Sequence, residues 1–135
     1  MGSTYEEHML RTGILNPQLN SLLSRVRHTN TLVIADRGFP FWPQIETIDL
    51  SLVDDIPTVL DVLKALSANF LVGKAWMATE FREHNTKIVL DQFSQLLPPI
   101  AFEPHIELKL RVPTAIGLIR TADTTQYSNV ILESA

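Results

Sequence analysis

Residues 27–40 read RHTNTLVIADRGFP, and this stretch decides the fold. It places His28 at the end of an expected helix, follows it with an apolar and β-branched run over 31–35, and then places Asp36. Such a run is typical of a buried strand. Ligands of open α/β sheets gather beyond the carboxyl ends of the strands. We therefore predict an α/β sheet with a site at one rim, where a histidine and a carboxylate transfer protons near neutral pH.

The same pattern of apolar strands and amphipathic helices continues along the chain. Helices are expected from residue 17 to 28, from residue 55, over 79–85 and over 86–97, and strands over 31–35, 46–52, 70–77, 106–110, 115–119 and 130–132. Strands separated by helices imply a mostly parallel sheet flanked by helices. The sequence thus predicts a single α/β domain over residues 12–135, after a mobile N-terminal leader over residues 1–11.

Composition excludes several classes of function. Apolar residues make up 45% of the 135 residues and charged residues 19%, with a net charge of −4, which suits a globular core and not a nucleic-acid binder. The absence of cysteine excludes disulfides, thiolate nucleophiles and zinc bound by cysteine. No apolar run approaches the roughly 20 residues of a membrane span. We expect a cytoplasmic protein with no membrane or nucleic-acid partner.

Two interpretations stay open for His28, and two for Asp36. His28 is a general acid or base, or it is a helix-end residue whose charge stabilises the last turn. Asp36 holds a ligand hydroxyl or orients an imidazole, or it is a turn residue that bonds its own backbone before Gly38.

The residues that follow the first and precede the last expected strand are also candidates. The aromatic loop of Phe39, Phe41 and Trp42 walls a pocket, fills a subunit contact or packs in the core. Tyr127, Ser128 and Asn129 precede the last strand, and the tyrosine and asparagine offer hydrogen bonds that suit sugar hydroxyls.

Motifs for metals and cofactors are missing. Glu80, Glu83 and His84 share one short helix without the spacing of a zinc protease motif, and no glycine-rich nucleotide loop or serine-hydrolase motif occurs. We predict neither a metal nor a cofactor.

Several separate blocks resemble one known family. Residues 13–16, 27–40, 48–52, 56–63, 80–85, 118–123 and 127–132 are similar, in order, to the D-ribose pyranase and L-fucose mutarotase family (RbsD/FucU-like), and their spacing is closer to the ribose pyranase branch. The resemblance implies interconversion of the ring forms of a free monosaccharide, without metal or nucleotide. It also implies a homo-oligomer, a large ring such as an octamer or a decamer, with sites near subunit contacts.

Position by position, the resemblance assigns roles to the candidate residues. It implies that His28 is the proton donor, that Asp36 binds the sugar, and that Tyr127 and Asn129 contact sugar hydroxyls, with Ser128 contributing backbone. The alternative is a non-catalytic sugar-binding or sugar-transport accessory protein of the same fold. A purely structural ring-forming subunit is the third class.

Two departures from the family pattern are expected to matter. Ribose pyranases carry a sugar-binding histidine on a helix before the penultimate strand, and here residues 106–114 read as a strand that runs almost directly into the next one. Arg111 and His105 are the candidate substitutes for that histidine, although neither stands at a matched position. The second departure is Ala122-Asp123, where the family commonly has Gly-Glu.

Overall fold

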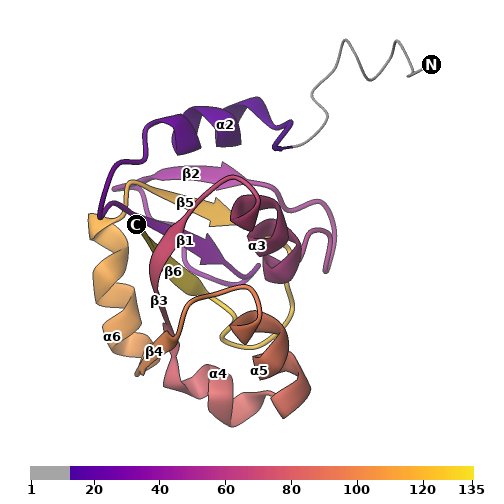
Figure 1. Ribbon diagram of the computed structural model, residues 1–135. Coiled ribbons are helices and arrows are strands. Elements are labelled where there is room, and N and C mark those ends of the chain that lie inside the picture. Colours follow the sequence, from indigo (N-terminus) through magenta and orange to yellow (C-terminus); the bar gives the residue numbers. More distant parts are fainter. Residues whose placement is uncertain (1–12) are drawn as a thin grey trace, which may run out of the picture.

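A computed structural model describes residues 13–135 and shows one six-stranded sheet with the strand order β2-β5-β1-β6-β3-β4 (Figure 1). The leader expected over residues 1–11 lies outside the described residues. The strands are β1 (Thr31–Ala35), β2 (Glu46–Asp49), β3 (Val72–Ala78), β4 (Ile100–Glu103), β5 (Gly117–Arg120) and β6 (Val130–Ser134).

The sheet is mixed, and most of its pairings are parallel. Strands β1, β5 and β2 run parallel to one another, as do β3 and β4. Strand β6 lies antiparallel between β1 and β3 and joins the two parallel halves. The predicted fold class, a mostly parallel α/β sheet flanked by helices, is confirmed.

Helices cover both faces of the sheet (Figure 1). They are α2 (Pro17–Ser24), α3 (Val59–Ser67), α4 (Thr79–His84), α5 (Lys87–Ser94) and α6 (His105–Arg111), followed by the 3₁₀ turn η1 (Val112–Thr114). The larger core lies between one face and α2 to α5, and it buries Leu22, Leu63 and Phe93. The smaller core lies under α6 and η1 on the other face, around Leu108 and Val112.

Local capping explains where the helices begin. The Asn16 side chain accepts the backbone N–H of Leu19 at 2.8 Å, and proline opens α2. Thr58 and Asp61 form a reciprocal capping box at the start of α3. These helices start within a few residues of the predicted positions.

Residues 106–110 form part of a helix, so the strand predicted there is wrong. Ile106, Leu108 and Leu110 alternate with charged residues, which imitates a strand. In α6, Leu108 is 1% exposed and packs in the core, whereas Ile106 and Leu110 lie one turn apart on the outer face, 72% and 75% exposed. The sequence prediction also missed the short strand β4.

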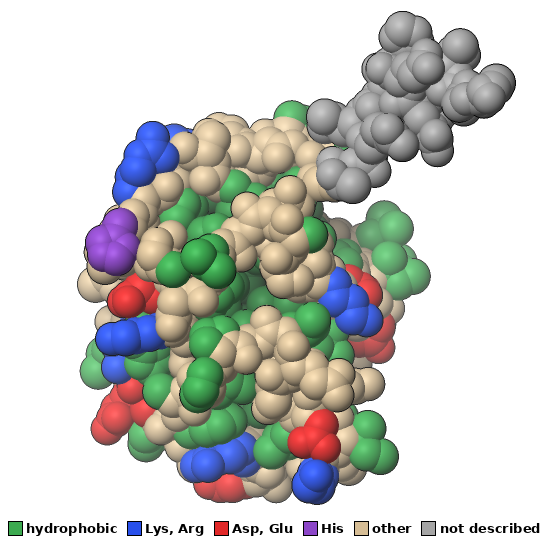
Figure 2. Space-filling view, viewed as in Figure 1, with side chains coloured by type: hydrophobic (Ala, Val, Ile, Leu, Met, Phe, Trp, Pro, Cys, Tyr) green, Lys and Arg blue, Asp and Glu red, His purple; other side chains and the backbone are tan. Residues whose placement is uncertain are grey.

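None of the helices within residues 13–135 combines the length and apolar character that crossing a membrane requires. On the face seen in Figure 2, Lys and Arg side chains are scattered and mixed with Asp and Glu. That face lacks the basic stripe by which proteins neutralise a phosphate backbone.

The larger core generates a first prediction. Phe93 on α5 is 1% exposed and meets Phe81 edge to face, with ring centroids 4.8 Å apart. Phe93→Ala is expected to lower the free energy of unfolding by about 3–5 kcal/mol, because it removes a buried aromatic ring and leaves a cavity. Ile88→Ala on the same helix, at a residue 74% exposed, is the control and is expected to cost less than about 0.5 kcal/mol in urea unfolding. Equal losses in the two variants would contradict this packing.

Candidate functional site

The candidate site lies at the edge of the sheet where β1, β3 and β4 end. Because β6 is antiparallel to β1, with Ile34 opposite Val130, the residues before β6 lie beside those after β1. Asp36 follows β1, His105 follows β4, and Tyr127 and Asn129 precede β6. Chain direction therefore brings these four side chains to one rim.

A pocket of about 430 Å³ opens at this rim. Its lining includes Asp36, Phe39, His105, Gln126, Tyr127 and Asn129. Three of these, Asp36, Tyr127 and Asn129, are site residues predicted from the sequence. His105 is a fourth site residue, which the sequence prediction did not assign to a matched position.

Asp36 and Asn129 are held together by a backbone contact. The Asn129 side-chain oxygen accepts the backbone N–H of Asp36 at 2.7 Å, and the Asp36 carboxylate accepts the N–H of Gly38 at 3.1 Å. Burial raises the pKa of the Asp36 carboxyl above its usual value, although hydrogen bonds from Gly38, Phe39 and Asn129 oppose this. The carboxylate is thus a fixed acceptor at the pocket wall.

Tyr127 stands between two imidazole rings. His84 stacks on the tyrosine ring with centroids 5.3 Å apart, and His105 meets it edge-on at 5.2 Å. The backbone of Tyr127 has φ 55°, a left-handed conformation that is costly for a residue with a side chain. Asn85 holds the preceding carbonyl, that of Gln126, with a 2.9 Å hydrogen bond, which helps to maintain this turn.

His105 occupies the first position of α6, so the helix expected to be missing is present and carries a histidine. Its ring also meets Phe39 edge-on, with centroids 6.0 Å apart. Burial, and then Lys109, lower the pKa of His105 below its usual value, whereas Glu80 and Asp36 oppose the shift. Its Nδ1 atom is buried and has no hydrogen-bond partner among residues 13–135. Both properties suit an imidazole that exchanges a proton or a hydrogen bond with a ligand.

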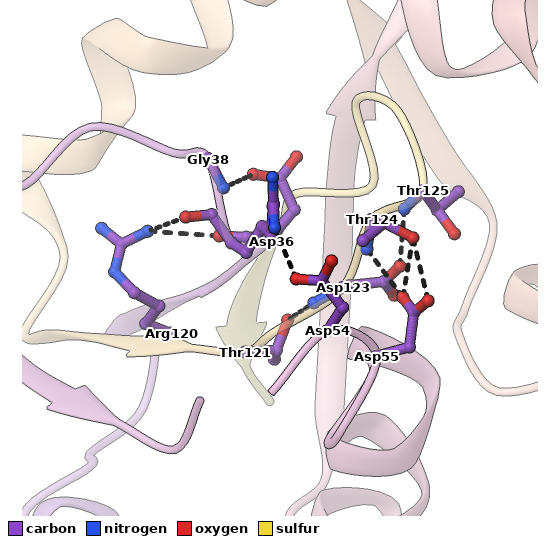
Figure 3. A network of polar contacts seen from close by, with 10 residues as sticks. Asp36, Gly38, Asp54, Asp55, Arg120, Thr121, Asp123, Thr124 and Thr125 are labelled. Atoms are coloured by element: carbon purple, nitrogen blue, oxygen red, sulfur yellow. Dashed lines mark hydrogen bonds and ion pairs between the residues drawn. The ribbon is translucent and has the colours of Figure 1, made fainter. Parts of the chain in front are cut away.

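Arg120, at the end of β5, holds the loop that carries Asp36 (Figure 3). Its guanidinium donates to the backbone carbonyls of Asp36 at 3.2 Å and Arg37 at 3.3 Å. It also donates to the carbonyl of Pro40 at 3.2 Å. One planar side chain thus satisfies three carbonyl groups of one turn. The guanidinium fixes the wall of the pocket on the side of Gly38.

Asp123, one of the two departures from the family pattern, has a structural role. It is 3% exposed, and its carboxylate accepts the backbone N–H of Val59 at 2.8 Å and that of Thr125 at 2.8 Å. The first contact caps α3 and the second shapes the loop before β6. Beside it, Asp55 accepts hydrogen bonds from Thr124 (Figure 3). Asp123 therefore ties the loop of Tyr127 to a helix of the larger core.

His28 does not lie at this pocket within one chain. It is exposed and precedes β1, whereas Asp36 follows β1. A strand of this length separates its two ends by about 16 Å, at about 3.3 Å per residue. A separate hollow of about 300 Å³ lies at the His28 end, lined by residues that include Thr29 and Arg111. The prediction that His28 and Asp36 share one rim is thus not met inside a single chain.

The remaining candidates divide by exposure. Phe39 is 5% exposed and lines the pocket, Trp42 packs on it with ring centroids 6.3 Å apart, and Phe41 is 70% exposed. Ser128 is buried, and its hydroxyl donates to the carbonyl of Thr125 at 3.0 Å. Its side chain does not line the pocket, which leaves the backbone contribution that the resemblance implied.

Candidate metal ligands do not cluster in the part of the chain that the structure describes, since no three acidic or histidine side chains are placed to hold one ion. The polar groups that line the pocket are carboxylate, imidazole, phenol and amide groups. These groups suit a ligand with several hydroxyls and an apolar face, since they offer both donors and acceptors beside aromatic rings.

Comparison with known proteins identifies the family to which a chain with this fold and pocket belongs. The model of the RbsD / FucU transport protein family matches residues 9–135, and the chain belongs to this family. Among its curated relatives are the D-ribose pyranase of Laribacter hongkongensis, 39% identical over 127 residues covering 93% of this chain and 97% of that protein, and the D-ribose pyranase of Geobacillus kaustophilus, 37% identical over 127 residues covering 93% of each.

Two solved structures are similar in fold to this chain. Bacillus subtilis RbsD complexed with D-ribose is 33% identical, with a TM-score of 0.87 over 94% of this chain and 98% of that one. The fucose mutarotase of Streptococcus pneumoniae in complex with L-fucose has a TM-score of 0.79 over 94% and 98% of the two chains. At 15% identity the latter shows a shared fold alone.

The contacts of Arg120 generate a second prediction. Arg120→Met keeps the length of the side chain and removes its donors to the 36–40 loop. Amide hydrogen exchange at Arg37, Gly38 and Phe39 is expected to become faster, because the turn that orders these N–H groups loses its anchor. Arg25→Met, which breaks a surface ion pair with Glu46, is the control and leaves these amides unchanged. Unchanged exchange in Arg120→Met would show that the loop is held by other contacts.

Proposed function

We propose that this chain is a monosaccharide mutarotase or pyranase that interconverts the ring forms of a free aldose, with D-ribose as the first sugar to test. The observation that carries the proposal is the convergence of Asp36, His105, Tyr127 and Asn129 on one pocket. The names of the curated relatives and the D-ribose complex of the similar Bacillus subtilis protein support it.

The reaction needs only proton transfers. Opening a cyclic sugar removes a proton from the anomeric hydroxyl, delivers one to the ring oxygen and breaks the bond between the ring oxygen and the anomeric carbon. Closing through another hydroxyl exchanges pyranose for furanose, and closing on the other face of the carbonyl exchanges anomers. General acid–base help contributes roughly 10²–10⁴-fold, a suitable scale for a reaction that also proceeds in water.

The pocket offers a role for each group in this chemistry. The Asp36 carboxylate accepts a hydrogen bond from a sugar hydroxyl, and Asn129 holds Asp36 in place. Tyr127 and Phe39 lie against the less polar face of the sugar ring. His105 exchanges a hydrogen bond with a hydroxyl.

We further propose that His28 is the proton donor and that it acts in the pocket of a neighbouring copy. Its position before β1 keeps it from Asp36 of its own chain, which follows β1. Its side chain is exposed, so it is accessible to a neighbouring copy. The exposed apolar side chains of Ile106 and Leu110, beside His105 on α6, support a contact near the pocket. A homo-oligomeric ring such as an octamer or a decamer, and a cytoplasmic location, remain predictions.

The alternative function is a sugar-binding or sugar-transport accessory protein without catalysis. One observation favours it: the proton donor that the resemblance assigned is absent from the pocket of a single chain. Under this alternative the pocket binds ribose in calorimetry while the rate of ring exchange stays that of ribose in buffer.

Saturation-transfer NMR on D-ribose is expected to show pyranose–furanose exchange accelerated by the wild-type chain. Asp36→Asn and His105→Gln are expected to lose most of this acceleration, because each variant removes a group that holds a sugar hydroxyl in the pocket. Asp91→Asn, on the outer side of α5, is the control with full activity. If the wild-type protein accelerates the exchange of ring forms of neither ribose nor fucose, the proposed enzymatic activity is excluded.

Mixed oligomers test the position of His28. His28→Ala and Asp36→Asn are each expected to be inactive as pure proteins with an intact fold. Co-expression of the two is expected to restore part of the activity, because some sites then combine the His28 of one chain with the Asp36 of another. Full activity of His28→Ala, or a wild-type chain that light scattering shows to be an active monomer, would contradict a shared site.

A further inference from the structure

Helix α4 contacts two residues that line the pocket, His105 and Tyr127, but none of its own residues lines it. Glu80, its second residue, accepts the backbone N–H of His105 through Oε1 at 3.0 Å. One turn later, His84 stacks on Tyr127. The contact of Glu80 is the one that reaches the backbone of His105, the residue whose imidazole is assigned to the site.

The start of α6 depends on this contact. The residue before the helix is Pro104, which makes no side-chain cap. The first N–H groups of a helix have no partner inside the helix, and a carboxylate is their best acceptor. Glu80 supplies that acceptor from another element, and so fixes the backbone from which His105 extends.

Glu80 is also ionised when it does so. Burial alone would raise the pKa of Glu80, but hydrogen bonds from its own N–H and from that of His105, with the nearby imidazoles of His105 and His84, keep the pKa below its usual value. Glu80 therefore carries its full negative charge at any pH at which a histidine titrates.

The charged groups around His105 act in opposite directions. Lys109 on α6 disfavours a second positive charge, whereas Asp36 after β1 and Glu80 on α4 favour it. The Tyr127 phenol ring lies at the edge of the imidazole from the loop before β6. Burial is the largest influence and also disfavours the charge, so Glu80 and Asp36 are the groups that favour a second proton on the ring. Nδ1 of His105 is buried without a hydrogen-bond partner among residues 13–135.

We propose that Glu80 is a positioning residue for His105: it fixes the start of α6 and supplies the negative charge that allows the imidazole to be protonated in the pocket. This inference rests on the proposed function, in which His105 contacts the sugar. It assigns Glu80 no contact with the substrate. The separate contribution of the charge is what distinguishes this role from a purely structural cap.

Glu80→Gln separates the two contributions, because glutamine keeps an oxygen to accept the His105 N–H and loses the charge. Titration of the His105 ring by NMR of the histidine-labelled full chain, with the signal assigned by its loss in His105→Gln, is expected to show a lower pKa in Glu80→Gln than in the wild type. The inflection that His105 gives to the pH profile of ribose exchange is expected to move the same way. Glu83→Gln, which removes the same charge from the exposed side of α4, is expected to change neither.

Glu80→Ala removes the acceptor as well as the charge, and is expected to raise KM for D-ribose above that of Glu80→Gln. A His105 titration in Glu80→Gln that matches the wild type, in a protein with wild-type thermal unfolding, would overturn the inference. An equal shift in Glu83→Gln would also overturn it, because the effect would then be one of net charge. If the wild type exchanges no sugar, the proposed function fails while the titration still decides the role of Glu80.

Discussion

The antiparallel strand β6, inserted between β1 and β3, is the constraint on which the site depends. Its pairing with β1 places Asn129 beside the end of β1, where the Asn129 side chain accepts the N–H of Asp36. A parallel strand in the same place would carry Tyr127 and Asn129 to the opposite rim. The sheet therefore forms the pocket by chain direction, and the side chains of Arg120 and Asp123 then hold its loops.

Much of the fold could be predicted because its signals are local. A β-branched run marks β1, and Asn16 with Pro17 marks the start of α2. The place of Asp36, Tyr127 and Asn129 at the pocket could be predicted for a related reason, since Asp36 follows one run that reads as a strand and the other two residues precede another. The direction of β6 has no local signal, because it is set by pairing with strands distant in sequence.

The helix that begins at His105 was missed for a physical reason. The alternation of Ile106, Leu108 and Leu110 has the period of a strand. Only tertiary packing shows that Leu108 of α6 and Val112 of η1, one helical turn apart, form one buried side. The repeat of Leu108 and Val112 after a proline was the available signal for a helix. The position of His28 was misjudged differently: residues on either side of a strand lie at opposite edges of the sheet.

The central claim is that a sugar ring binds among Asp36, His105, Tyr127 and Asn129. A crystal structure of the chain with D-ribose tests it most directly. We expect a ribose hydroxyl within hydrogen-bond distance of the Asp36 carboxylate and another at His105, with His28 of a neighbouring copy at the mouth of the pocket. Ribose bound instead in the hollow beside Thr29 and Arg111, with the pocket at Asp36 empty, would contradict the account.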